Sequence, residues 1–181
     1  MDQKVTEPPP EATEQLSGGA IISALKDAGV DYVLSVPDLH TANGLLMPIA
    51  DDPDLTLIRT CKEDECLGIS AGLSYGDKRA VVLIQYTGFL YAMNAIRAVA
   101  AEHQKPICLM VGLLGKPPGV APQDAKRIGV RAVEPMLDIM GIPRQLIETD
   151  DDVPLIAPAI VEAYENQHPT AFLIGRRPVA P

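Results

Sequence analysis

One segment of this sequence constrains the fold more than any other: the apolar run 80–85, which reads Ala-Val-Val-Leu-Ile-Gln. A strand without polar alternation is expected where helices cover both faces of a parallel sheet. From Ser17 onward, strand-like and helix-like segments alternate along the chain, as they do in α/β proteins. We therefore expect an α/β fold, a single-domain, doubly wound, six-stranded parallel sheet with right-handed crossovers. The expected strands are 32–36, 55–60, 80–85, 106–111, 145–147 and 170–174, and the expected helices are roughly 18–28, 40–50, 67–74 (directly after the acidic segment 62–65), 90–101, 130–140 and 153–166.

Length and composition place limits on the class of protein. The 181 residues suffice for one domain with a full core, expected at 17–181 after a disordered N-terminal arm over 1–16. Apolar runs are too short to span a membrane and the first residues lack a secretory pattern, so a cytoplasmic protein is expected. The net charge of −9 argues against nucleic acid as a partner, because phosphate binding needs clustered Lys and Arg.

Several common site motifs are missing. The chain has no Gly-x-Gly-x-x-Gly after its first expected strand, no Gly-Lys-Ser/Thr phosphate loop and no Gly-x-Ser-x-Gly elbow. These absences remove dinucleotide binding, P-loop chemistry and a recognisable hydrolase from consideration. We also expect no metal ligands among the cysteines and histidines, whose spacing fits no metal site: Cys61, Cys66, Cys108, His40, His103 and His168.

An acidic segment, Lys62-Glu63-Asp64-Glu65, stands between a strand-like run and a helix rich in small residues. Acids at the carboxyl edge of a parallel sheet lie where open α/β folds bind their ligands. The alternative interpretation is that the three acids only complement the positive end of the helix dipole.

Four segments in order resemble the pyrimidine-binding domain of thiamine diphosphate enzymes, and most closely the alpha subunits of the sulfopyruvate and phosphonopyruvate decarboxylase family. The resemblance covers nearly the whole chain from residue 17 to about 177. The four segments are Val36-Pro37-Asp38, Lys62-Glu63 through Ala71-Gly72, Gln85-Tyr86-Thr87-Gly88 through Asn94, and Val111-Gly112 through Met140-Gly141-Ile142-Pro143. The resemblance implies thiamine diphosphate as the cofactor and decarboxylation of a 2-oxo acid as the reaction. A non-catalytic α/β binding module is the alternative from another class.

The resemblance assigns the catalytic glutamate to Glu63, because the family places an Ala-Gly pair eight and nine residues later, as in Ala71-Gly72. Such a carboxylate shares a proton with the pyrimidine ring and so activates the cofactor. Asp64 and Glu65 are the alternatives if this register is wrong by one or two residues.

Further roles follow from the same resemblance. Asp38 would lie over the substrate and manage protons, with His40 assisting it; the alternative is that Asp38 only begins a turn or helix. Gln85, Thr87 and Gly88 would contact the cofactor. Two bulky residues in this region, Tyr86 and Phe89, depart from the family pattern, and we expect them to add bulk near the substrate.

The family's second domain is not evident in this sequence. That domain holds the diphosphate and Mg²⁺ with a Gly-Asp-Gly motif, whereas the nearest string here is Gly76-Asp77-Lys78. The resemblance therefore implies a separate beta subunit that holds the Mg²⁺ and completes the site in a hetero-oligomer.

The substrate implied by the resemblance is 3-sulfopyruvate, converted to sulfoacetaldehyde and CO₂, with phosphonopyruvate or an uncharged 2-oxo acid as the alternative. A distal anion needs cationic partners. Lys116 and Arg131, in or after the long loop that follows Val111, are the substrate-binding candidates, and solvated surface charge is the alternative interpretation for both.

Overall fold

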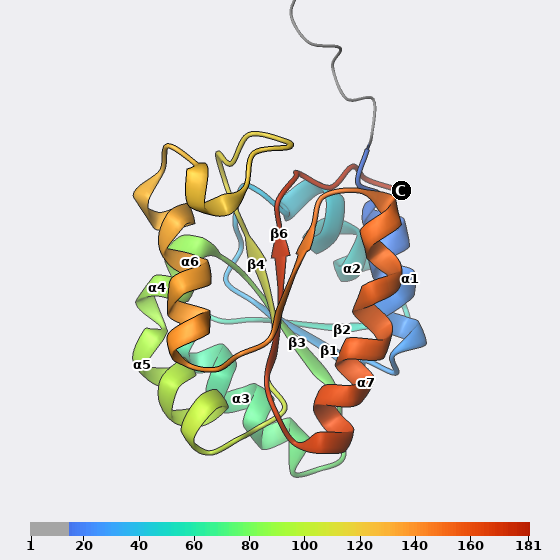
Figure 1. Ribbon diagram of the computed structural model, residues 1–181. Helices are drawn as coiled ribbons and strands as arrows, with labels where there is room; N and C mark the ends of the chain where they lie inside the picture. The colour runs from blue at the N-terminus through green and yellow to red at the C-terminus, as the bar shows by residue number, and fades with distance from the viewer. Residues whose placement is uncertain (1–14) are drawn as a thin grey trace, which may run out of the picture.

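The computed structural model describes residues 15–181, which form one six-stranded, all-parallel sheet with helices on both faces (Figure 1). The sheet order is β2-β1-β3-β4-β6-β5. The strands are β1 (Tyr32–Ser35), β2 (Thr56–Arg59), β3 (Ala80–Gln85), β4 (Cys108–Gly112), β5 (Arg144–Ile147) and β6 (Thr170–Ile174). The expected α/β fold class is confirmed. Among the described residues, no helix is both long and apolar enough to cross a membrane.

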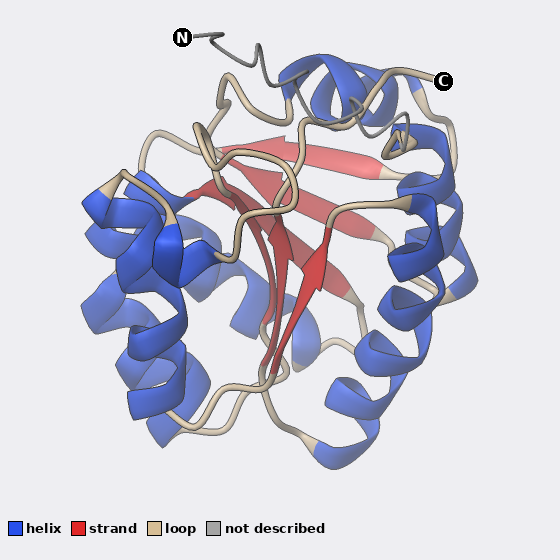
Figure 2. Cartoon of the chain, turned by 45° about the horizontal axis from the view of Figure 1, so that its top comes forward, coloured by secondary structure: helices blue, strands red, loops and turns tan. Residues whose placement is uncertain are grey.

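Two helical layers enclose the sheet, as Figure 2 shows from a tilted view. One layer contains α1 (Gly18–Asp27), the π-helical turn η1 (Ala42–Leu46), α2 (Met47–Asp51) and α7 (Ile156–Asn166), which follows the 3₁₀ turn η4 (Asp150–Leu155). The other layer contains α3 (Glu63–Ser74), α4 (Tyr86–Tyr91), α5 (Met93–Ala95), η2 (Ile96–Glu102) and α6 (Ile128–Ile139), which follows the 3₁₀ turn η3 (Pro122–Asp124).

Strand β3 explains the apolar run from which the fold was predicted. Val81 and Leu83 pack into the core beneath α1 and α7, whereas Val82 and Ile84 pack into the core beneath α3 and α6. Side chains alternate between the two faces of a strand, so a strand covered on both faces needs apolar residues at every position. Both cores therefore meet at β3.

The expected boundaries were correct for most elements and wrong in one place that affects the site. The expected helix 90–101 instead begins as α4 at Tyr86, directly after β3 ends at Gln85, with no loop between them. The expected helix 40–50 is a π-helical turn followed by a short α-helix, from Ala42 to Asp51. Residues 1–14 of the expected arm lie outside the described residues, while Leu16 is fully buried.

Candidate functional site

A cavity of about 390 Å³ opens at the carboxyl edge of the sheet, where β1 and β3 lie side by side. The chain leaves β1 toward β2 on one side, while β3 lies on the other side. Open α/β sheets bind ligands at such a switch point. The cavity is lined by segments that follow β1 and β3 and by the start of α3: Val36, Pro37, Asp38, Leu39, Ala42, Glu63, Gln85 and Thr87.

Glu63 is the first residue of α3, and its partly exposed carboxylate lines the cavity. It lies directly against Gly88 of α4. A Cβ atom at Gly88 would stand 2.4 Å from Glu63 Cγ and 2.5 Å from Glu63 Oε1. The missing side chain of Gly88 therefore makes the space that Glu63 occupies.

The two neighbouring acids have other positions. Glu65 Oε2 accepts hydrogen bonds from the backbone N–H groups of Cys61 (3.1 Å) and Lys62 (3.3 Å), so this carboxylate caps the N-terminus of α3. Asp64 is exposed, and neither it nor Glu65 lines the cavity. Of the three alternatives in the sequence, Glu63 alone faces the cavity.

Asp38 also lines the cavity, but its carboxylate is held by its own loop. Oδ1 accepts the backbone N–H groups of His40 (2.5 Å) and Thr41 (2.9 Å), and Oδ2 accepts the Thr41 hydroxyl (2.6 Å). The expected turn-initiating role of Asp38 is thus present together with its position at the cavity.

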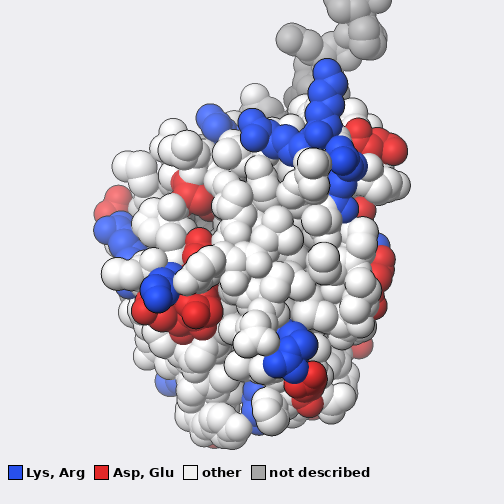
Figure 3. All heavy atoms as spheres, turned by 90° about the vertical axis from the view of Figure 1, so that its left-hand side faces the viewer, with Lys and Arg blue, Asp and Glu red and all other residues white. Residues whose placement is uncertain are grey.

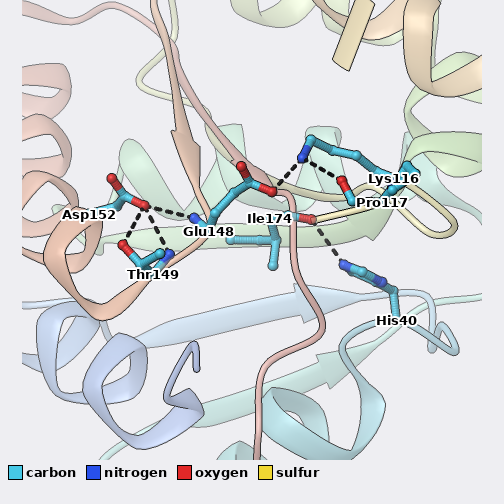
Figure 4. A network of polar contacts seen from close by, with 7 residues as sticks. All are labelled: His40, Lys116, Pro117, Glu148, Thr149, Asp152 and Ile174. Carbon is cyan, nitrogen blue, oxygen red and sulfur yellow. Dashed lines mark hydrogen bonds and ion pairs between the residues drawn. The ribbon is translucent and has the colours of Figure 1, made fainter. Parts of the chain in front are cut away.

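His40 is buried and does not line the cavity. Its Nε2 lies 3.0 Å from the carbonyl oxygen of Ile174, and since a carbonyl can only accept, Nε2 carries the proton (Figure 4). Burial lowers the pKa of this imidazole, which favours the neutral ring. The ring also lies against Gly112, so it ties the β1 loop to the ends of β4 and β6.

Gln85 and Thr87 form the β3 side of the cavity. The Thr87 hydroxyl donates a 3.0 Å hydrogen bond to Gln85 Oε1. The Gln85 amide N–H groups remain as donors at the cavity wall, next to the oxygen acceptors of Glu63 and Asp38.

The expectation that Tyr86 and Phe89 add bulk near the substrate is wrong. Both side chains belong to the buried core beneath α4, and neither lines the cavity. The Tyr86 ring lies so close to Gly129 of α6 that a Cβ there would be 2.3 Å from the ring. These residues attach α4 to α6.

Lys116 and Arg131, the two expected substrate-binding cations, do not line the cavity. The Lys116 side chain is fully buried, where Nζ forms an ion pair with Glu148 and donates to the carbonyl of Pro117 at 3.2 Å (Figure 4). Arg131 donates to the carbonyls of Ala125 (3.0 Å) and Lys126 (3.1 Å). Both cations hold the long loop after β4 in place.

Thr41 is a residue that the sequence reasoning missed. Its hydroxyl is fully buried and donates to a carboxylate at the cavity wall. The spacing Asp38-x-x-Thr41 places the carboxylate near the backbone N–H three residues later, which is the pattern of a capping turn. That spacing was the available signal.

Residues 17–114 match the family model described as "Thiamine pyrophosphate enzyme, N-terminal TPP binding domain". This chain belongs to the thiamine pyrophosphate enzyme family. The predicted family and the predicted cofactor, thiamine diphosphate, are thereby confirmed.

Curated proteins similar to this chain carry the name sulfopyruvate decarboxylase. The chain is 32% identical over 156 residues to "Sulfopyruvate decarboxylase subunit alpha" of Methanocaldococcus jannaschii, covering 85% of this chain and 90% of that one. It is 30% identical over 96 residues to the protein of that name from Methanococcus maripaludis, covering 53% and 57%. "Sulfopyruvate decarboxylase" of Methanosarcina acetivorans is 24% identical over 162 residues, covering 86% of this chain and 39% of that one.

The cavity fits the pyrimidine half of thiamine diphosphate. A flat heteroaromatic ring needs apolar walls for its faces and polar groups for its edge. Apolar walls come from residues such as Val36 and Leu39, and polar groups from Glu63 and Gln85. Gly88 makes room for the Glu63 side chain at the cavity wall. The cavity does not fit the diphosphate half of the cofactor, which is negatively charged. Among the described residues, those that line the cavity include two acids and no Lys or Arg.

Proposed function

We propose that this chain is the alpha subunit of a thiamine diphosphate-dependent decarboxylase that converts 3-sulfopyruvate to sulfoacetaldehyde and CO₂. The names and coverage of the relatives support the activity. The observation that carries the proposal is the position of Glu63, a carboxylate that lines the cavity at the β1/β3 switch point against a glycine.

Glu63 has the central role in this chain. Thiamine diphosphate, when bound, supplies an electron sink for the electrons released on loss of CO₂. Glu63 would hold a proton at a ring nitrogen of the pyrimidine, sharing it through a short hydrogen bond. Its position at the first residue of α3 fixes the backbone from which the side chain extends, since the residues on both sides belong to the helix or to the Glu65 cap.

The other cavity residues would bind and orient. Gln85 and Thr87 would offer amide and hydroxyl groups to the edge of the pyrimidine, and Gly88 makes room for the Glu63 side chain. Asp38 would lie at the substrate end of the cavity. His40, which is buried and neutral by virtue of its lowered pKa, would support the Asp38 loop rather than exchange protons with the substrate.

A beta subunit would hold the diphosphate with its Mg²⁺. The two acids at the cavity, Glu63 and Asp38, would repel a diphosphate placed beside them. The relatives named as subunit alpha imply a partner chain in their own enzymes. We therefore propose a hetero-oligomer whose active site lies between the two chains.

The cation that binds the distal sulfonate would come from the rim of the site or from the partner. Lys116 and Arg131 are already engaged within this chain. Figure 3 shows Lys and Arg side chains gathered along the upper rim, which is the carboxyl edge of the sheet in Figure 1. Exposed residues of the edge segments include Arg127 and Arg177.

The test is to co-purify this chain with a beta subunit of the family and to measure CO₂ release from 3-sulfopyruvate, phosphonopyruvate and pyruvate. We expect turnover of 3-sulfopyruvate that requires Mg²⁺ and thiamine diphosphate. Preference for phosphonopyruvate or pyruvate would correct the substrate, and no release from any 2-oxo acid would refute the decarboxylase.

A matched pair of variants tests the role of Glu63. Glu63→Gln should lower kcat by about 10³-fold, within the range of general acid–base catalysis, because an amide cannot share the proton. Glu65→Gln should retain activity, because the amide oxygen still accepts the N–H groups of Cys61 and Lys62. The opposite pattern would move the catalytic acid to Glu65.

Titration calorimetry tests whether both subunits are needed to bind thiamine diphosphate. The chain alone should bind thiamine diphosphate weakly, and addition of the beta subunit should produce tight, Mg²⁺-dependent binding. Tight binding to the chain alone would contradict the two-subunit site.

A further inference from the structure

The side chain of Arg127 lies against the backbone of Gly115, at the carboxyl edge of the sheet. Gly115 is the third residue of a turn over 113–116 that directly follows β4, in which the N–H of Lys116 donates to the carbonyl of Leu113 at 3.0 Å. Its φ of +83° lies in the left-handed region, which favours glycine. A Cβ atom at Gly115 would stand 2.2 Å from Arg127 Nε and 3.0 Å from Cζ. The missing side chain of Gly115 therefore makes the space that the Arg127 guanidinium occupies.

Both segments that meet at this contact are held by other parts of the chain. On the side of the turn, the N–H of its first residue donates to the carbonyl of Ile174 at 3.0 Å, and the buried Lys116 side chain forms an ion pair with Glu148. On the side of α6, Arg131 donates to the carbonyls of the two residues before Arg127, at 3.0 Å and 3.1 Å. The backbone on either side of the contact is therefore fixed.

The donors of the Arg127 guanidinium are available to a ligand. The side chain is exposed, and its guanidinium forms no hydrogen bond or ion pair with any other residue in the described range 15–181. Arginine carries five N–H donors in a planar fork, which suits a group with several charged oxygens. Since the side chain already lies against Gly115, binding such a group would cost less conformational freedom than it would for an unconstrained side chain.

The contact lies beside the cavity. Gly112, the residue before the turn, is paired in register with Gln85 of the cavity wall, and neighbouring strands are about 4.8 Å apart. The second residue of α6, Gly129, lies against the ring of Tyr86, which directly follows Gln85 in the chain. Figure 1 shows the loop after β4 and the start of α6 at this edge of the sheet. Arg127 is therefore at the rim of the cavity, on the side of β3 and β4.

The charges of the cavity disfavour a doubly anionic ligand unless a cation lies nearby. Glu63 and Asp38 line the cavity, and among the described residues no Lys or Arg does. A 2-oxo acid with a distal sulfonate brings two negative charges toward these carboxylates, and like charges repel. A cation at the rim would offset this repulsion and would favour the doubly charged substrate over pyruvate.

We propose that Arg127 determines specificity for the distal anion of the substrate, and that Gly115 is the positioning residue that sets its guanidinium at the rim. The guanidinium binds the sulfonate oxygens through its N–H groups. This inference rests on the proposed function for the identity of the anion as a sulfonate. The placement of Arg127 against Gly115 does not depend on that function.

The experiment compares Arg127→Met, Arg127→Lys and Lys126→Met in the alpha–beta complex with thiamine diphosphate and Mg²⁺. Methionine keeps an unbranched stem and removes the charge, whereas lysine keeps the charge without the planar fork. Lys126→Met is the matched control, because Lys126 is the adjacent exposed cation and its side chain is not part of the contact with Gly115. Each variant is assayed with 3-sulfopyruvate and with pyruvate, which lacks the distal anion.

Arg127→Met should raise KM for 3-sulfopyruvate by about 10–100-fold, the range expected for loss of hydrogen bonds to a charged group. Its kcat should stay the same, because the sulfonate is bound equally in the ground state and the transition state. Arg127→Lys should give an intermediate KM, and Lys126→Met should behave as wild type. For pyruvate, KM should not change in any of these variants.

Three results would overturn the inference. The first is an unchanged KM for 3-sulfopyruvate in Arg127→Met, and the second is an equal rise for pyruvate. The third is an equal rise in Lys126→Met, which would mean that the overall charge of the rim acts rather than one placed guanidinium. Arg177→Met is a further comparison, because Arg177 is the exposed cation after β6. A rise confined to Arg177→Met would place the anion there and contradict the role of Arg127.

Gly115→Ala tests how the guanidinium is placed. The new Cβ would displace the Arg127 side chain, so KM for 3-sulfopyruvate should rise. In an Arg127→Met background, the same change should have no further effect on KM, because the two residues act as one unit. A further rise in the double variant would mean that Gly115 acts through the turn itself and would refute its positioning role.

Titration calorimetry with 3-sulfopropanoate, a sulfonate without the 2-oxo group, tests the site without catalysis. The wild-type complex should bind this compound at least about tenfold more tightly than the Arg127→Met complex does, and Lys126→Met should bind it as wild type does. Equal affinity of wild type and Arg127→Met, including no binding to either, would refute the anion site. If the complex decarboxylates no 2-oxo acid, the proposed function fails, and this comparison still decides the role of Arg127.

Discussion

Replacing Gly88 with alanine should separate activity from stability. The new Cβ would lie 2.4 Å from Glu63 Cγ and 2.7 Å from Cδ. Carbon atoms pack at about 3.5–4.0 Å, so the Glu63 side chain must move by about 1 Å or more. The end of a glutamate side chain can make this movement by changing rotamer, which would turn the carboxylate away from its place in the cavity.

The expected loss follows from this displacement. A misplacement of about 1 Å can lower a rate by about 10²-fold, which corresponds to about 3 kcal/mol of activation free energy. Stability should not fall in parallel, because Gly88 lies within α4, where alanine is favoured over glycine by about 0.5–1 kcal/mol. Gly88→Ala should therefore melt at or slightly above the wild-type temperature while kcat falls.

The control is Gly72→Ala in α3, where a Cβ would meet nothing within 4 Å. It should gain similar helix stability without loss of kcat. The assay is steady-state CO₂ release by the alpha–beta complex, together with thermal unfolding of the wild-type chain and of both variants. Wild-type kcat in Gly88→Ala would refute the contact between Gly88 and Glu63 as a determinant of activity.

Three further predictions concern residues away from the cavity wall. Burial lowers the pKa of His40, so the imidazole binds a proton more readily in the unfolded chain than in the folded one. The free energy of unfolding, measured by urea titration, should therefore decrease as pH falls below about 6.5. This decrease should be smaller in His40→Gln. Ellman's reagent should label one thiol in the native chain, the exposed Cys61. Burial raises the pKa of Cys66, and it raises the pKa of Cys108 to about 12, so these two thiols should not react. Labelling of all three thiols in the native chain would contradict their burial. Lys116→Met leaves the largely buried carboxylate of Glu148 without its partner, so the free energy of unfolding should fall by about 3–5 kcal/mol. A change near zero would mean that this ion pair does not hold the loop after β4.

The fold could be predicted because its strongest signal is local. A strand such as β3, covered on both faces, must be apolar wherever it is buried, and that pattern is visible in five consecutive residues, from Ala80 to Ile84. The acid at the start of α3 could be predicted as well, because strand, acid and small-residue helix follow one another in the chain. The structure then separates Glu63, at the cavity, from Glu65, in the cap.

The orientation of α4 could not be predicted from the expected end of β3. Once the helix begins at Tyr86, helical spacing places Tyr86 and Phe89 on the same face, which is the buried one. Thr87 then faces the cavity side. The earlier start of the helix changed the predicted role of Tyr86 and Phe89, whereas Thr87 lies at the cavity as expected.

The burial of Lys116 could not be predicted, because its ion-pair partner is distant in the sequence. Glu148 lies 32 residues later, directly after β5, and only the sheet order brings the two together. A lysine in a Gly/Pro-rich loop is usually exposed, and nothing in the local pattern distinguishes one that is fully buried.

The direct junction between β3 and α4 has a consequence for changes in chain length. With no loop between Gln85 and Tyr86, an inserted or deleted residue has no flexible segment in which to be absorbed. Each residue added would turn the helix by about 100°, a fraction of one helical turn. One insertion would thus carry Gly88 away from Glu63 and bring a side chain into its place. We expect length variants to be tolerated in the long loop after β4 and to be inactive at this junction.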